Sequence, residues 1–211
     1  MKTNISNFRI FKLSKIINVN NVKGNDDIVI RQARPEDRFD IAKLVYMVWD
    51  DMELELVKHL PKDMVLDAIE KSCVDATYRT FYQHILVYEV ENKVAGCIIS
   101  YSGENELKYE KAWELLDLPE KIKQYGTPLP VKEAKDDEYY IETIATFAAY
   151  RGRGIATKLL TSLLESNTHV KWSLNCDINN EAALKLYKKV GFISDGQIEL
   201  YKHMYHHLIV K

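Results

Sequence analysis

The chain has 211 residues, 46% of them hydrophobic, and a formal net charge of −2 at pH 7. This length and apolar content predict one domain with a single substantial core. The near-neutral charge argues against a nucleic-acid-binding protein, which needs a basic surface, and no apolar run approaches the roughly 20 residues of a membrane span. We therefore expect neither nucleic acid nor a membrane among the partners.

The three cysteines, Cys73, Cys97 and Cys176, are odd in number and form no Cys-x-x-Cys pair. This usage is typical of free thiols in a reducing compartment. No secretory signal core is visible either. We expect a cytoplasmic protein.

Residues 1–27 are rich in Asn and Lys and are interpreted as an N-terminal extension before a domain at residues 28–211. Their isolated apolar residues leave two interpretations open. The segment is folded onto the domain or partly disordered, or it is an arm that docks on a second subunit.

The first half of the chain predicts a strand at residues 28–33, a helix entered at Pro35, and a second helix at residues 62–76. Acidic residues crowd the connection between these helices: Asp50, Asp51, Glu53 and Glu55. Such a run is either an acidic rim that favours a cationic ligand or an ordinary solvated surface.

Two strands follow at residues 84–90 and 94–101, as a hairpin. Residues 104–118 are predicted to be helical, and several prolines then break the chain into a charged loop ending at Asp137. Long loops in compact domains tend to be functional or mobile. Residues 104–137 are therefore interpreted as an insertion.

A strand at residues 139–147, a turn with Gly152 and Gly154, and a helix from Ile155 follow. Amides at the start of such a helix have no intrahelical partner, and glycine lets an anion approach them closely. This pattern predicts a phosphate site. It is not a Walker loop, because Ile155 follows Gly154, and not a dinucleotide fingerprint, because position 157 is Thr.

Residues 170–176 predict another strand, residues 180–192 a short helix that ends at Gly191, and residues 197–210 a terminal pair of strands without a clear turn.

Two motifs give the chain a family resemblance. Residues 151–156 (RGRGIA) resemble the acyl-CoA pyrophosphate loop of the GNAT superfamily of N-acetyltransferases. Residues 180–192 resemble a second GNAT motif, Asn-x-x-Ala-x-x-Leu-Tyr-x-x-x-Gly-Phe, at every position: Asn180, Ala183, Leu186, Tyr187, Gly191 and Phe192. The resemblance covers about residues 28–210 except the insertion, and the long insertion is similar to that of a group of uncharacterised bacterial GNAT proteins.

The resemblance implies a mixed α/β fold. Its sheet would be twisted, largely antiparallel and of about six to seven strands, splayed between the fourth and fifth strands, with helices on both faces. The insertion would lie near the acceptor side. The implied activity is transfer of an acetyl group from acetyl-CoA to an amine of a small molecule or peptide by direct attack. Dimers are common among GNAT proteins, so a homodimer is left open.

The resemblance also implies a set of cofactor-binding residues, which come from the fourth strand, the glycine loop, the following helix and the second motif: Ile144, Ala145, Thr146, Arg151, Gly152, Arg153, Gly154, Ile155, Ala156, Thr157, Asn180 and Tyr187. Tyr187 matches the family tyrosine that protonates or holds the departing sulfur. Asn180 is equally a good helix N-cap.

Glu142 is the predicted general base, because a carboxylate in an otherwise apolar strand has a raised pKa. The alternatives are a structural, ion-paired Glu142, a water relay, or His84 or Glu138 as the base. No metal is expected, because His203, His206 and His207 cannot converge from one strand.

Two further functions remain open. One is a non-catalytic acyl-CoA-binding or interaction module that kept the loop and lost the base. The other is a nucleotide- or nicotinamide-binding protein.

Overall fold

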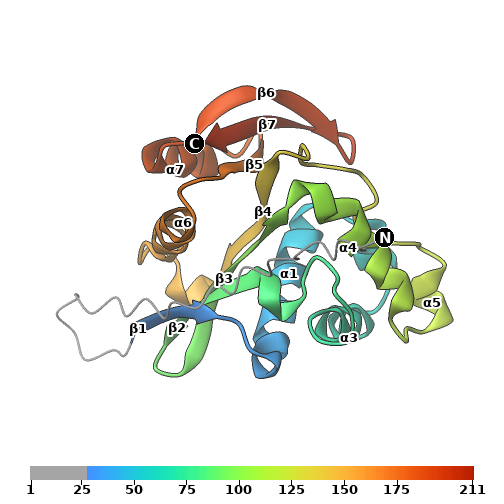
Figure 1. Ribbon diagram of the computed structural model, residues 1–211. Coiled ribbons are helices and arrows are strands. Elements are labelled where there is room, and N and C mark those ends of the chain that lie inside the picture. The colour runs from blue at the N-terminus through green and yellow to red at the C-terminus, as the bar shows by residue number, and fades with distance from the viewer. Residues whose placement is uncertain (1–27) are drawn as a thin grey trace, which may run out of the picture.

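The computed structural model describes residues 28–211, and these form a seven-stranded sheet in the order β1-β2-β3-β4-β5-β7-β6 (Figure 1). Among the strands that the structure describes, only β4 and β5 pair in parallel. The strands are β1 Ile28–Gln32, β2 Ile85–Val90, β3 Lys93–Ser102, β4 Glu138–Thr146, β5 Lys171–Asp177, β6 Ile193–Leu200 and β7 His203–Val210. The predicted extension at residues 1–27, including its docking role, lies outside the described residues.

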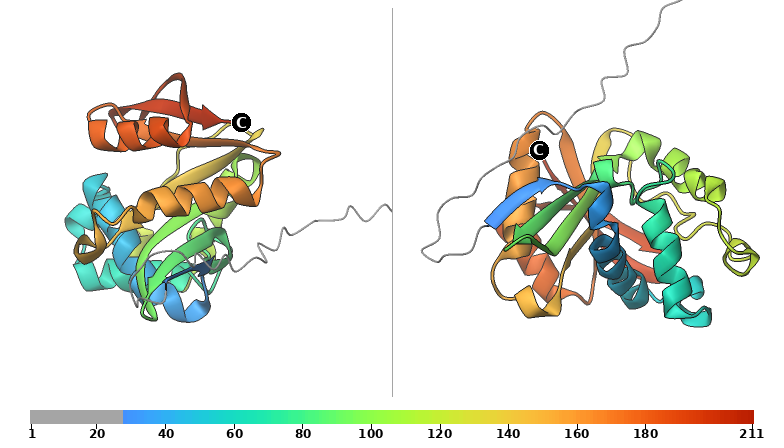
Figure 2. Two further views of the ribbon diagram at one scale, coloured as in Figure 1. Left: turned by 90° about the vertical axis from the view of Figure 1, so that its left-hand side faces the viewer. Right: turned by 90° about the horizontal axis from the view of Figure 1, so that it is seen from below.

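Helices cover both faces of the sheet, which separates two apolar clusters (Figure 2). One face carries α1 Arg38–Asp51, α2 Glu55–His59, α3 Lys62–Ser72, α4 Glu106–Lys111 and α5 Glu120–Lys123. The other carries α6 Ile155–Ser166 and α7 Glu181–Val190. Short 3-10 turns occupy Pro35–Asp37, Tyr82–His84, Gly103–Asn105, Ala112–Leu115 and Ala148–Tyr150.

The sheet divides between β4 and β5. Within the described chain these strands pair at three positions, Glu138 with Lys171, Tyr139 with Trp172 and Tyr140 with Ser173. Beyond Tyr140 they separate, and β5 continues in register with β7 (Figure 1). The end of β4 therefore has an edge that β5 does not cover, as the predicted splay requires.

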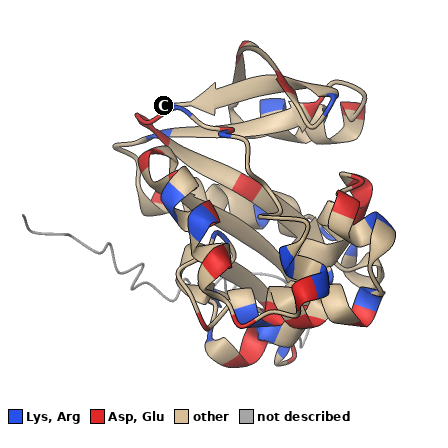
Figure 3. Ribbon diagram, turned by 90° about the vertical axis from the view of Figure 1, so that its right-hand side faces the viewer, with Lys and Arg blue, Asp and Glu red and all other residues tan. Residues whose placement is uncertain are grey.

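The surface charges are mixed. Acidic and basic residues are interspersed along the elements on the side of α3, α4 and α5 (Figure 3). This distribution agrees with the net charge of −2. Among the described helices, none has the length and apolar character needed to cross a membrane.

The insertion is the main correction to the predicted elements. The helix expected at residues 104–118 is wrong as a continuous element, since α4 ends at Lys111 and α5 begins only after Pro119. In α4 the burial of apolar and charged side chains is the reverse of what an amphipathic helix would show: Leu107 is 48% exposed, whereas Glu106 and Glu110 are buried. The insertion packs through these acids as well as through apolar side chains such as Trp113, Leu116 and Ile122. In addition, α2 was missed, and α3 ends at Ser72 rather than at residue 76.

The terminal hairpin turns through Tyr201 and Lys202, with φ of 51° and 69°. A two-residue type I′ turn requires positive φ at both central positions, and glycine or asparagine normally supplies it. Because this turn uses neither, the sequence carries no recognisable turn signal. The backbone conformation is strained at both residues.

Lys202→Gly should therefore raise the free energy of unfolding by roughly 0.5–1 kcal/mol, because glycine adopts positive φ without strain. The same change at Lys185, on an exposed face of α7, should lower it by about 1 kcal/mol, because glycine disfavours helices. Urea denaturation of both variants checks the pair. If both substitutions changed the free energy of unfolding in the same direction, the strain assigned to the turn would be contradicted.

Candidate active site

The turn before α6 presents free backbone amides. Gly152 and Gly154 adopt left-handed φ of 76° and 73°, and a Cβ at either would meet nothing within 4 Å. Gly154 caps α6, and the first helical amides have no intrahelical acceptor. No acid occupies the first turn. The positive end of the helix dipole therefore lies open to an anion.

A cavity of about 440 Å³ lies beside this turn. Its lining brings together α1, the uncovered end of β4, the glycine turn and one residue of α7: Met47, Val48, Asp51, Ile144, Ala145, Thr146, Tyr150, Arg151, Gly152, Gly154, Ile155, Ala156, Thr157 and Leu186. Most of the predicted cofactor-binding residues thus share one cavity. The turn and the β4 edge form adjacent walls.

Three predicted cofactor residues are not among the lining. Arg153 is exposed, with its guanidinium carbon 5.4 Å from the ring centre of Tyr150. Asn180 is the N-cap of α7 and accepts from the Ala183 amide at 3.0 Å. Tyr187 packs against Phe192, and burial raises the pKa of its phenol well above the ordinary value. Their cofactor roles remain predictions.

Glu142 lies at a β-bulge. Ile99 pairs with Thr143 and Ser100 with Ile141, so Glu142 has no partner on β3. Such a bulge re-aims a side chain. Here the carboxylate joins the face of the sheet that also carries Tyr140, and its side chain is 4% exposed.

Glu142 belongs to a buried polar cluster around Arg79, whose side chain is fully buried. The guanidinium lies within 4 Å of four carboxylates: Glu106 at 3.1 Å, Glu110 at 2.7 Å, Glu133 at 3.6 Å and Glu142 at 3.4 Å. The Tyr101 hydroxyl donates to Glu142 and also accepts from Arg79 at 2.9 Å. We call this set the Arg79 cluster.

One cation cannot balance four ionised carboxylates, so the Arg79 cluster favours bound protons. The pKa of Glu142 is raised to about 7, chiefly by burial and also by the charge of Glu133, while Arg79 and the Tyr101 hydroxyl oppose the change. Within the described chain, Oε1 of Glu142 is buried without a hydrogen-bond partner. This oxygen retains its capacity to accept a proton.

Of the Arg79 cluster, only Glu142 was predicted from the sequence as a site residue. Glu106 and Glu110 are one helical turn apart, which was an available signal for one acidic helix face. Arg79 follows α3 and Glu133 precedes β4, far apart in sequence. Residues 104–137 were expected only to form a helix and a charged loop near the acceptor side.

The alternative bases, His84 and Glu138, are not among the residues that line the cavity. His84 Nδ1 is 3.0 Å from the Arg79 carbonyl, and burial lowers the pKa of this imidazole. Burial alone would raise the pKa of Glu138, but a bond from the Lys135 amide and one from His207 lower it. Glu138 is therefore held ionised, with a Lys171 ammonium at 3.2 Å.

The histidines of β7 differ in burial. His207 is buried between Asn175 at 2.8 Å and Glu138 at 3.2 Å, whereas His203 is exposed. Glu138, Asp195 and His207 offer ligand atoms within 4.8 Å of one another. Lys135, however, pairs with Asp195 at 2.6 Å, so cationic side chains already balance these acids. All three cysteines are free, as predicted.

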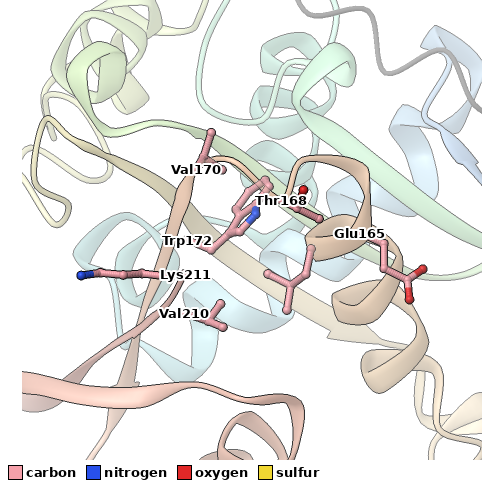
Figure 4. Close-up of a pocket in the computed structure, with 7 residues that line it drawn as sticks. Glu165, Thr168, Val170, Trp172, Val210 and Lys211 are labelled. Carbon is pink, nitrogen blue, oxygen red and sulfur yellow. The ribbon is translucent and has the colours of Figure 1, made fainter.

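A second cavity, of about 200 Å³, lies between the end of α6, the start of β5 and the end of β7 (Figure 4). Its walls are mostly apolar and include Val170, Trp172 and Val210, with Glu165 and Lys211 at its margin. It lies by the start of β5, where β4 and β5 are still paired. It is separate from the glycine turn and the Arg79 cluster.

The split sheet and the open helix start are features of an acyltransferase class. Residues 45–192, well over half of the chain, match the model of the acetyltransferase (GNAT) family. The protein belongs to this family. The family match confirms the predicted fold and the predicted enzyme class.

Known proteins give more detail. A crystal structure of an N-acetyltransferase from Staphylococcus aureus Mu50 is 99% identical, with a TM-score of 0.85 over 86% of this chain and 99% of that chain. An aminoglycoside acetyltransferase, AAC(6′)-Ib, solved in complex with coenzyme A, is 16% identical, with a TM-score of 0.54 over 87% of this chain and 94% of that chain, and shares the fold.

Among curated relatives, the N-alpha-acetyltransferase RimI of Mycobacterium tuberculosis is 44% identical over 55 residues, or 26% of this chain. The aligned segments span no more than 35% of the length of the curated relatives.

The pKa of Glu142 generates a stability prediction. Because it rises from 4.5 to about 7 on folding, the folded state binds a proton that the unfolded state has lost, and stability falls as pH rises between these values. Glu142→Gln removes this loss. The difference between the free energies of unfolding of Glu142→Gln and wild type, measured by urea denaturation, should therefore shift in favour of the variant by about 3 kcal/mol between pH 4 and pH 8. A difference that does not change with pH would contradict the raised pKa.

Proposed function

We propose that the protein transfers the acetyl group of acetyl-CoA to an amine of a small molecule or peptide by direct attack. The observation that carries this proposal is the open start of α6 beside the uncovered edge of β4, in one cavity. Acetyl-CoA would supply the activated acetyl thioester. The remaining chemistry is assigned to side chains and backbone groups of this chain.

The cavity fits the cofactor. The absent Cβ atoms of Gly152 and Gly154 leave open space over the turn, and Arg151 adds a positive charge to the lining. Free amides at a helix start suit a diphosphate. Backbone groups of residues 144–146 on the edge left by β5 would hold the pantetheine arm.

The acceptor amine must lose a proton to act as a nucleophile. Glu142 suits this task, because a pKa of about 7 leaves part of the carboxylate ionised at neutral pH and able to accept a proton. Its buried Oε1 is the oxygen left without a partner in the described chain. Tyr187, whose phenol stays protonated, would donate to the departing sulfur.

The acidic residues near the cavity bear on the choice of acceptor amine. Asp51 lines the cavity and would attract a cationic acceptor, whereas Glu53 and Glu55 pair with Lys58 and His59 at the surface. RimI is named as an N-alpha-acetyltransferase, which makes a peptide N-terminus one candidate to test. A cytoplasmic location and a homodimer complete the proposal.

One observation favours a second candidate, a non-catalytic acyl-CoA-binding module. The Glu142 carboxylate is 4% exposed, ion-paired to Arg79, and not part of the cavity lining. This is the arrangement expected of a structural glutamate. The two candidates differ in turnover, not in cofactor binding.

Gly154→Ala should weaken CoA binding at least about tenfold, because a methyl group enters the open space over the turn and the strained φ shifts the amides. Gly126→Ala is a matched control: Gly126 has φ of 70°, and its Cβ would also meet nothing within 4 Å. Both variants should lose similar stability. Calorimetric titration with CoA decides, and equal affinity in the two variants would contradict the proposed site.

Glu142→Gln should lower kcat by a factor of about 100 or more while CoA affinity is retained, as expected for loss of a general base. The wild-type rate should rise with pH through about 7, where Glu142 ionises. Release of the CoA thiol, measured across a panel of amines and peptides, is the assay. Turnover by neither protein on any acceptor, with CoA bound by both, would favour the non-catalytic module.

A further inference from the structure

The Arg79 cluster extends to the point where the sheet divides. Glu133, 6% exposed, lies there on the insertion before β4. One carboxylate oxygen accepts from the Tyr140 hydroxyl at 2.6 Å, and the other accepts from the Tyr201 hydroxyl at 2.9 Å. Its carbonyl accepts from the Asn175 side-chain amide at 3.1 Å.

These three partners come from both sides of the split. Tyr140 is the last residue of β4 that pairs with β5, and its partner there is Ser173. Asn175 lies on β5 two residues beyond Ser173. Tyr201 belongs to the turn between β6 and β7. The Asn175 amide also donates to the Tyr140 hydroxyl at 3.2 Å. Side chains therefore join the two strands where the backbone ladder has stopped.

Glu133 is also linked to the predicted base. Nη1 of Arg79 lies 3.6 Å from Oε1 of Glu133 and 3.4 Å from Oε2 of Glu142. The two carboxylates share one buried guanidinium. Ionisation of either one therefore makes ionisation of the other less favourable.

We propose that Glu133 is a positioning residue that holds the split between β4 and β5 at the cofactor cavity and, through the guanidinium of Arg79, governs the charge of Glu142. This inference rests on the proposed function. It gives the insertion a defined task at the centre of the domain.

Other ionisable groups face Glu142 or share Arg79 with it, and none of them is changed in these experiments. They come from the segment after α3, from β3 and β4, and from α4: Tyr78, Arg79, Tyr101, Glu106, Glu110 and Tyr140.

The charge link is tested with Glu133→Gln, which removes the charge and keeps the length of the side chain. In a ¹³C NMR titration of glutamate carboxyls, the Glu142 midpoint should move down by about one pH unit, because a like charge is lost. Glu114→Gln, at an exposed position of the same insertion, should leave it unmoved. An unmoved midpoint in Glu133→Gln would overturn the link.

Should Glu133→Gln not fold, the wild-type protein decides the same question. Coupled carboxyls each report both titration steps. Independent single-step curves for Glu133 and Glu142, assigned by through-bond correlations, would overturn the link.

The positioning role is tested with Tyr201→Phe, which removes one bridging hydroxyl and no charge at neutral pH. Calorimetry should show CoA affinity reduced roughly threefold or more, while the Glu142 midpoint moves less than in Glu133→Gln. Wild-type affinity in Tyr201→Phe would overturn this role. If the wild-type protein itself does not bind CoA, the proposed function is rejected, and the carboxyl titration still decides the link to Glu142.

Discussion

The buried guanidinium of Arg79 is the interaction on which the rest of this structure depends. An isolated charge in a protein interior is costly, and it persists only where counter-charges and hydrogen bonds surround it. Arg79 meets that need with carboxylates from α4, from the insertion and from β4. It also donates to the carbonyl of Leu129 at 2.6 Å. These polar contacts add to the apolar contacts that Trp113, Leu116 and Ile122 of the insertion make with the core.

Binding and chemistry are divided between two kinds of group. Backbone groups at the glycine turn and the end of β4 lie in the cavity wall together with residues of α1 and α7, and their positions follow from strand pairing and helix geometry. The proposed proton transfer instead involves side chains in the Arg79 cluster. A bulge at Glu142 connects the two, because the same strand supplies the cavity edge and the carboxylate.

Much of the fold could be predicted from the sequence because its signals are local. Apolar periodicity indicated β1 to β5, α1, α3, α6 and α7, and the glycine turn was recognisable from six residues. The Arg79 cluster was not, because its members meet only in the tertiary structure. The exposed Leu107 and the buried Glu106 invert the usual amphipathic pattern. The turn at Tyr201 was hidden because it lacks glycine.

The short ladder between β4 and β5 bears on how the domain loses its structure. Strands β1 to β4 form one hydrogen-bonded block and β5, β7 and β6 another, joined through three backbone pairs (Figure 1). Blocks of this kind can open as separate cooperative units. The contacts of Glu133 add side-chain links across that seam. Glu133, which lies outside both blocks, therefore helps to couple their unfolding, together with the apolar cluster that spans them.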